Sequence, residues 1–133
     1  MEKSKNYIFA IGRRKSAVSR IRLIKGKGDS LVNSLPIDKY FPGAVMQKIY
    51  QEPLVVCDVV NKYYATIKVL GSGKMGQLTA VVHGLSRALV KIKPEFKSLL
   101  KKKGFLTRDP RERQRRMIGM GGKSRRRKQS PKR

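Results

Sequence analysis

The alternation of hydrophobic and polar residues predicts a small set of β-strands. Residues 17–25 (AVSRIRLIK) alternate imperfectly, as expected for a half-buried strand. One face carries Ala17, Ser19, Ile21 and Leu23, and the other carries Val18, Arg20, Arg22 and Ile24. Residues 62–70 (KYYATIKVL) alternate in the same way and predict a second long strand. Two shorter strands are expected at residues 7–11 and 31–32.

A hydrophobic period near 3.6 residues predicts the principal helix at residues 79–91. The opposite, polar face carries His83, Arg87 and Lys91, and we expect His83 to be an exposed surface residue. Gly84 lies inside this helix, where glycine costs about 1 kcal/mol relative to alanine, so it indicates close packing against another element. The apolar stripe consists of Val81, Val82, Leu85, Ala88 and Leu89.

Shorter helices are expected on both sides of this element. One lies around residues 36–41, and another covers residues 44–51 and ends at Pro53, because proline disrupts a helix interior. A third begins at Pro94 and ends at Gly104. The order of elements predicts an α+β fold, with a small mixed four-stranded sheet and helices on one of its faces.

The hydrophobic pattern stops after residue 106. We therefore expect a globular α+β domain at residues 1–106 and an extended basic tail at residues 107–133. The last 15 residues, GMGGKSRRRKQSPKR, contain seven basic residues, no acidic residue and one apolar side chain, Met120. Such a segment cannot bury enough surface to fold alone, so we expect the tail to become ordered only on RNA.

The charge of the chain indicates a polyanionic partner. The chain has 33 Lys and Arg residues against 8 Asp and Glu residues, a formal net charge of +25. Nucleic acid is the abundant polyanion that matches this charge, and binding through phosphates is strongly salt-dependent. The basic residues form three groups: the predicted loop with Arg13, Arg14 and Lys15, the helix face with Arg87 and Lys91, and the segment after Lys101.

The glycine-rich turn GSGKMG (71–76) is the strongest argument for an enzyme. It matches the GxGxxG pattern of dinucleotide sites and lies between a predicted strand and a helix. The acid that should end a second parallel strand is Glu95, which lies at a predicted helix start instead. We therefore interpret the turn as a flexible connection, and backbone N–H groups at the helix start could hold one nucleic-acid phosphate. A nucleotide-dependent enzyme stays a third hypothesis.

Other chemistry finds little support in the sequence. With one histidine and one cysteine, a metal site is not expected, and Cys57 in an apolar run is interpreted as a small buried side chain. The acidic residues are scattered, so we expect no catalytic residues, cofactor or small-molecule substrate. No apolar run approaches the ~20 residues needed to span a bilayer, so no membrane partner is expected.

Four motifs together resemble a known family. They occur in the order found in the universal ninth protein of the small ribosomal subunit, a bacterial and organellar family. The motifs are GRRKSAVSRIRL (12–23), the GxGxxGQ turn (71–77), HGLSRAL (83–89) and LxxxGFLTRDxR (100–111). The resemblance implies a structural protein that binds ribosomal RNA in the subunit head, beside neighbouring head proteins, and extends its tail towards peptidyl-site tRNA.

The resemblance assigns roles to the basic residues. Lys132 and Arg133 at the tip of the tail would approach the tRNA. The remaining basic residues expected to contact ribosomal RNA are Arg13, Arg14, Lys15, Arg87, Arg108, Arg111, Arg113, Arg115, Arg116, Lys123, Arg125, Arg126, Arg127 and Lys128.

The sequence departs from the family pattern at several positions. They include Met75, Leu78, Thr79 and Val82, and Pro131 takes the place of a serine near the tip. This divergence, with no targeting segment, indicates an organelle-encoded protein of plastid (chloroplast) ribosomes, with the bacterial cytoplasm as the alternative. The second functional hypothesis, which rests on charge alone, is a free, nonspecific nucleic-acid-binding or RNA-chaperone protein.

Overall fold

The computed structural model describes residues 6–119 of the chain. Its core is a mixed five-stranded sheet with the strand order β1-β2-β5-β3-β4. β2 pairs antiparallel with both β1 and β5, whereas β3 runs parallel to β5. The strands are β1 (Tyr7–Arg14), β2 (Ala17–Lys25), β3 (Leu31–Val32), β4 (Leu35–Pro36) and β5 (Tyr63–Leu70).

The mixed α+β fold is confirmed, and the sheet has one strand more than expected. The additional strand, β4, contains two residues and pairs with β3 around a tight turn. Asn33 and Ser34 in this turn have positive φ angles of 49° and 69°. Such short edge strands leave no alternation to detect, because period-2 patterning needs at least four residues.

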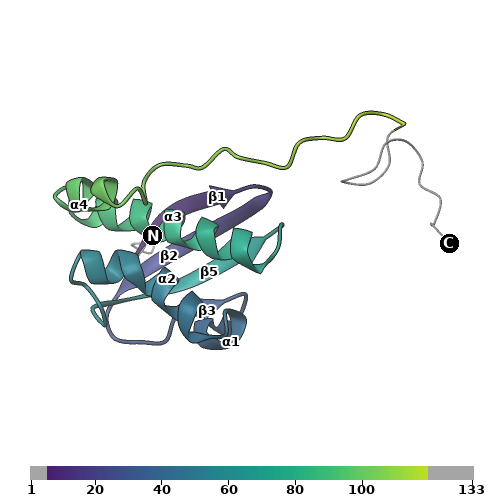
Figure 1. The fold of residues 1–133 in the computed structure, drawn as a ribbon. Helices are drawn as coiled ribbons and strands as arrows, with labels where there is room; N and C mark the ends of the chain where they lie inside the picture. The colour runs from purple at the N-terminus through teal and green to yellow at the C-terminus, as the bar shows by residue number, and fades with distance from the viewer. Residues whose placement is uncertain (1–5, 120–133) are drawn as a thin grey trace, which may run out of the picture.

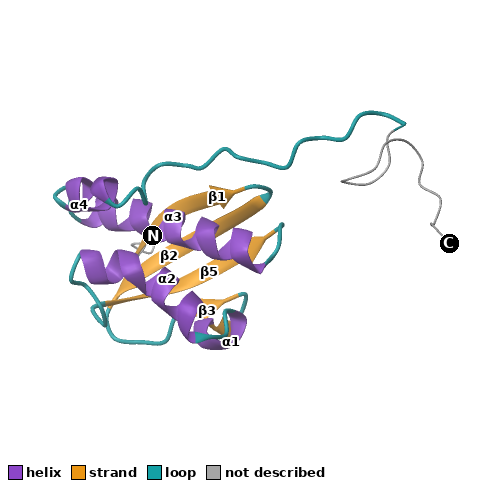
Figure 2. Cartoon of the chain, in the orientation of Figure 1, coloured by secondary structure: helices purple, strands orange, loops and turns teal. Residues whose placement is uncertain are grey.

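Four helices cover one face of the sheet (Figures 1 and 2). In Figure 2 the two long helices, α2 and α3, cross in front of the strands. Their apolar side chains pack on Ile21, Leu23, Ile67 and other inward-facing strand residues to form the core. The helices are α1 (Ile37–Tyr40), α2 (Ala44–Val56), α3 (Lys74–Ile92) and α4 (Phe96–Lys102).

Two expected helix boundaries were wrong. α2 does not end at Pro53 but continues to Val56, with Pro53 buried in its last turn. Proline removes one backbone donor and need not end a helix whose remaining turn is packed. α3 begins at Lys74 rather than at residue 79, because the end of the glycine turn already forms the first helical turn. α4 ends before Gly104 as expected, where φ is +77°.

The close packing expected at Gly84 is confirmed. A Cβ atom on Gly84 would lie 2.6 Å from Ile21 Cδ1, and one on Gly12 of β1 would lie 1.9 Å from the carbonyl oxygen of Ala80. Both distances are far below van der Waals contact. The absence of side chains at these two positions therefore lets α3 lie directly against the backbone of β1.

Candidate nucleic-acid interface

The first basic group, expected in a loop, lies mostly in a strand. β1 extends to Arg14, so the connection to β2 is a tight turn at Lys15 and Ser16. Lys15 adopts a positive φ of 52° and is exposed at the tip of the hairpin. Because side chains alternate along a strand, Arg13 and Arg14 point to opposite faces of the sheet.

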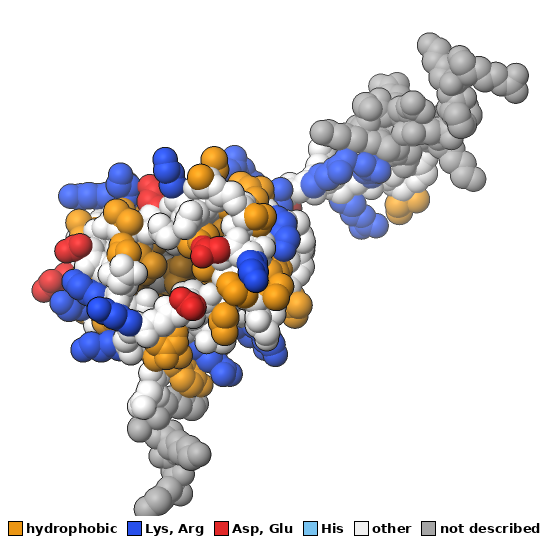
Figure 3. Space-filling view, turned by 90° about the horizontal axis from the view of Figure 1, so that it is seen from below, with side chains coloured by type: hydrophobic (Ala, Val, Ile, Leu, Met, Phe, Trp, Pro, Cys, Tyr) orange, Lys and Arg blue, Asp and Glu red, His pale blue; other side chains and the backbone are white. Residues whose placement is uncertain are grey.

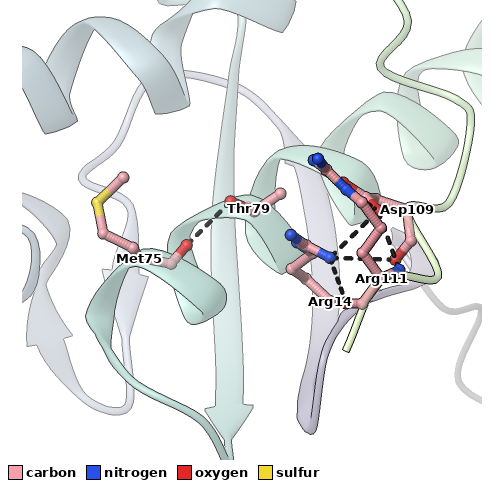
Figure 4. A network of polar contacts seen from close by, with 5 residues as sticks. All are labelled: Arg14, Met75, Thr79, Asp109 and Arg111. Atoms are coloured by element: carbon pink, nitrogen blue, oxygen red, sulfur yellow. Dashed lines mark hydrogen bonds and ion pairs between the residues drawn. The ribbon is translucent and has the colours of Figure 1, made fainter. Parts of the chain in front are cut away.

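Arg14 contacts the beginning of the tail (Figure 4). Its Nη1 donates to the carbonyl oxygen of Arg111 at 2.7 Å and lies 3.2 Å from Asp109 Oδ1. Asp109 in turn accepts from Arg111 Nε at 2.9 Å and from Nη2 at 2.6 Å. The bonds from Arg111, with the nearby charge of Arg14, lower the pKa of Asp109 well below its ordinary value. The carboxylate thus stays ionised and joins the tail to β1.

His83 is buried, so the expectation of a surface histidine was wrong. Its Nδ1 accepts a hydrogen bond from the backbone N–H of Arg13 at 3.2 Å. The pKa of His83 is lowered mainly by desolvation and then by the charge of Arg87, while a hydrogen bond to the backbone of Leu106 opposes this shift. The helical wheel placed His83 on a polar face, but β1 and the start of the tail cover that side.

We call residues 106–111 the tail root. Arg14 of β1 contacts it at Asp109 and Arg111, and Leu106 at its start packs against the hydrophobic core. The bonds of Arg14 join residues that are 95 and 97 positions apart in the sequence. They define the direction in which the described part of the tail leaves the body, past the β1–β2 hairpin (Figure 1).

The second basic group lies on the exposed side of α3. Arg87 Nη1 donates to the carbonyl oxygen of Ile11 at 2.7 Å, and Lys91 Nζ donates to that of Phe9 at 2.5 Å. Both side chains therefore reach from the helix to the outer edge of β1, where the strand carbonyls have no neighbouring strand among the described residues. Arg87 thus contacts the same strand, β1, that carries Arg13 and Arg14.

The third group includes arginines of the tail root and of the residues that follow it. Residues 107–116 contain no helix or strand, and their arginines are exposed. The structure thus places these charges where a large anion can reach them: Arg108, Arg111, Arg113, Arg115 and Arg116. The remaining expected RNA and tRNA contacts lie outside the described residues: Lys123, Arg125, Arg126, Arg127, Lys128, Lys132 and Arg133.

The glycine turn lacks the surroundings of a dinucleotide site. Such a site needs a second parallel strand that ends in an acid after the helix. In the described residues, α3 leads into α4 instead, and Glu95 is the residue before α4. Near the turn, Thr79 Oγ1 donates to the carbonyl oxygen of Met75 at 2.9 Å, so the hydroxyl at this divergent position is satisfied within α3 (Figure 4).

Residues 6–119 contain no candidate metal-binding cluster and no candidate membrane-spanning helix. This part of the chain contains no group of three or more His, Cys, Asp or Glu side chains that could hold a metal ion. None of its helices has the length and apolarity needed to cross a membrane. Cys57 is buried, as expected, and burial raises the pKa of its thiol.

Comparison with known proteins gives consistent matches. A profile of the family described as "Ribosomal protein S9/S16" matches residues 12–133. The chain is 46% identical over 117 residues to "Small ribosomal subunit protein uS9" of Lawsonia intracellularis, covering 88% of this chain and 90% of the relative. It is 44% identical over 119 residues to the protein of the same name from Maridesulfovibrio salexigens, covering 90% and 92%.

Proposed function

We propose, from the premise that the chain belongs to the ribosomal protein S9/S16 family, a role for each of its two parts. As a member of this family it is a structural protein of the small ribosomal subunit and not an enzyme. In our proposal the body binds ribosomal RNA in the subunit head. The tail passes between RNA strands and brings Lys132 and Arg133 to the backbone of peptidyl-site tRNA.

The observation that supports this proposal is the attachment of the tail root to the body. Arg14 holds Asp109 and Arg111 at the end of β1, and Leu106 packs against the hydrophobic core. A flexible basic segment loses much conformational entropy when it is ordered on a partner. A root that is already held on the body loses less conformational entropy when the partner binds, which reduces that cost.

Removal of residues 130–133 tests the role of the tip. We expect small subunits to assemble at normal levels and to bind peptidyl-site tRNA more weakly, measured by filter binding to purified subunits. A full-length variant with Lys132→Gln and Arg133→Gln separates the effect of charge from that of length. Unchanged tRNA affinity in both variants would refute the role of the tip.

Sedimentation at moderate salt distinguishes this function from free, nonspecific nucleic-acid binding. We expect the tagged protein to migrate with small subunits in a sucrose gradient. A predominant free pool would support the RNA-chaperone alternative instead.

We also propose, from the divergent positions in α3 and at the tail tip, that a plastid genome encodes the chain. The two relatives named above come from bacteria, and bacterial cytoplasm is the alternative location. The genome that carries the coding sequence decides between them.

A further inference from the structure

We propose that the face of the sheet opposite the helices is a second RNA-binding surface. We call it the open face and define its cationic centre as Arg20 and Arg22 of β2 and Lys68 of β5. It would bind the phosphate backbone of ribosomal RNA, independently of the tail. The inference rests on the proposed function, because it takes the same RNA as the partner.

The open face follows from the alternation of side chains along the long strands. In β2, Ala17, Ser19, Ile21 and Leu23 are buried under the helices, whereas Arg20 and Arg22 are exposed on the other side. β5 repeats this pattern and exposes Lys68. All helices of the described residues lie on the opposite side of the sheet (Figure 2), so these cations are accessible.

The register of the strands brings the cations together. Arg20 lies directly opposite Lys68 in the β2–β5 pair, and Arg22 follows two residues later on the same face. Directly opposed side chains on one face have Cβ atoms about 4.5–5.5 Å apart, and like charges at such positions destabilise a sheet. The fold therefore gains nothing from this arrangement by itself.

The sheet supplies no anion to compensate these charges. None of the residues in β1, β2 and β5 is acidic. In the described part of the chain, the ion pairs involve Asp109 at the tail root. A bound polyanion would remove the repulsion between Arg20 and Lys68 and would be attracted by all three cations.

Aromatic side chains favour RNA over another polyanion. The guanidinium of Arg22 lies over the ring of Tyr7, with Cζ 5.1 Å from the ring centroid. Phe9 is the residue of β1 paired with Arg22, and it is 41% exposed although it is large and apolar. Exposed aromatic and guanidinium planes beside cations can stack on bases while the cations bind phosphates. An acidic peptide offers no bases for these planes.

A cavity on the helix-covered side has a different character, although exposed lysines surround it. The cavity, of about 660 Å³, opens between α2, the β2–β3 connection and the sheet, and its lining includes Asp29 and Asp38. Figure 3 shows this hollow, with hydrophobic side chains inside and acidic side chains beside it. Carboxylates at this position repel phosphate, so within the globular body the open face is the better site for RNA. Exposed lysines on the helical side provide a matched control.

The first experiment compares two triple variants of the full-length protein. One carries Arg20→Gln, Arg22→Gln and Lys68→Gln, and the control carries Lys39→Gln, Lys48→Gln and Lys97→Gln, which remove the same charge from α1, α2 and α4. Binding to small-subunit ribosomal RNA is measured by filter binding between 50 and 200 mM salt. Three lost phosphate contacts should make the affinity of the open-face variant roughly 20- to 40-fold less sensitive to this salt change than that of the unmodified protein. The control should change much less.

Equal changes in the two variants would overturn the proposal, because they would mean that only total charge matters. Thermal unfolding followed by circular dichroism verifies that each variant folds. This outcome can be distinguished from a failure of the proposed function. If the open-face substitutions do not change RNA binding more than the control substitutions, and the variant still enters small subunits, the open face is ruled out but the proposed role of the tail is unaffected.

A second experiment identifies what contacts the open face in assembled subunits. Thr66 lies between Arg22 of β2 and Leu31 of β3 on this face, and Thr66→Cys provides an attachment point for a photocrosslinker. Cys57 is 5% exposed and should remain unlabelled. We expect crosslinks to ribosomal RNA. Crosslinks to a neighbouring protein, or no crosslinks, would contradict the proposal.

Discussion

Arg14 at the end of β1 and Arg20 in the middle of β2 carry the same side chain in different surroundings. Arg14 is 14% exposed and is paired within the protein with Asp109 and two carbonyl oxygens of the tail root. Arg20 is exposed and lies opposite Lys68, in a sheet whose long strands contain no acid. The contacts of the first arginine therefore stabilise the protein, whereas the like charge opposite the second is unfavourable for the sheet.

The difference shows that a count of basic residues does not define an RNA interface. Arg14 was expected to bind RNA because it is part of a basic cluster in the sequence, yet its guanidinium is engaged with the chain itself. Arg20 and Arg22, absent from the expected contacts, present their charge to the surroundings. What distinguishes them is the position of the acidic residues in the fold, which brings Asp109 to one arginine and none to the other.

The largest effect is expected when the contact of α3 with β1 is disrupted, because the surroundings of both Arg14 and Arg20 depend on it. Gly12→Ala would place a Cβ atom 1.9 Å from the carbonyl oxygen of Ala80. Overpacking against backbone cannot be relieved by a side-chain rotation, so we expect the free energy of unfolding to fall by about 3 kcal/mol. Urea denaturation measures it. Substitutions in the tail root or on the open face change surface contacts, whereas Gly12→Ala should shift the whole unfolding transition.

Gly73→Ala provides the control for this prediction. A Cβ atom at Gly73 meets nothing within 4 Å, and its φ of −92° suits any residue. Gly73 is the residue before α3, so Gly73→Ala should lower the free energy of unfolding by less than about 1 kcal/mol. Equal destabilisation of the two variants would contradict the close approach of α3 and β1.

The next effect concerns the histidine that links β1 to the tail root. Protonation of His83 would remove the acceptor Nδ1 used by Arg13, and burial together with Arg87 and Arg108 lowers the pKa of His83 below its ordinary 6.5. The stabilisation by neutral His83 is therefore fully present above pH 6.5. It decreases as the pH falls from 6.5 towards the lower pKa of His83 in the folded protein. We expect the free energy of unfolding to decrease between pH 7 and 5 by up to about 1.4 kcal/mol per pH unit.

His83→Asn should abolish this dependence, because its Oδ1 can still accept from Arg13 but does not titrate. His83 is the one histidine of the chain, so no other side chain with an ordinary pKa titrates in this range. Urea denaturation at several pH values makes the comparison. A pH dependence that persists in His83→Asn would show that another group is responsible.

Much of the fold could be predicted from the sequence, because its determinants are local. Alternation at residues 17–25 gives β2 as observed, and residues 62–70 differ from β5 by one residue. Gly104 correctly marked the end of α4 because a positive φ follows the helix. The two-residue strand β4 and the continuation of α2 through Pro53 depend instead on neighbouring segments, which leave no local pattern.

The site was less predictable, because it depends on contacts between segments that are far apart in the sequence. The basic segments were identified from composition, but the bond from Arg14 to the Asp109 carbonyl joins residues 95 positions apart. The burial of His83 likewise requires β1 and Leu106 to meet α3. The outward arginines of β2 were visible in the alternation. The position of Arg20 opposite Lys68 could be recognised only once the pairing of β2 with β5 was known.

A smaller, local effect is expected when the tail root loses its carboxylate. Asp109→Asn removes the charge that holds Arg14 and Arg111 and should leave global unfolding nearly unchanged. Trypsin should then cleave after Arg108 and Arg111 several-fold faster, since proteolysis follows the population of locally opened states. Glu112→Gln is the matched control, because it removes the same charge from the exposed tail beyond these contacts. Equal cleavage of both variants would show that Asp109 does not restrain the tail root.

The smallest predicted effect is a gain in stability, and it distinguishes Arg20 from Arg14 directly. Arg20→Thr removes one of two like charges that face each other across β2 and β5 and introduces a residue favoured in strands. We expect the isolated protein to become more stable by about 0.5 kcal/mol, measured by urea denaturation at low salt, and to bind ribosomal RNA more weakly. Added salt should reduce the gain, because screening already weakens the repulsion. Arg14→Thr, which removes the partner of Asp109, should not stabilise the protein. A loss of stability in Arg20→Thr would mean that Arg20 makes favourable contacts within the fold and would remove the contrast with Arg14.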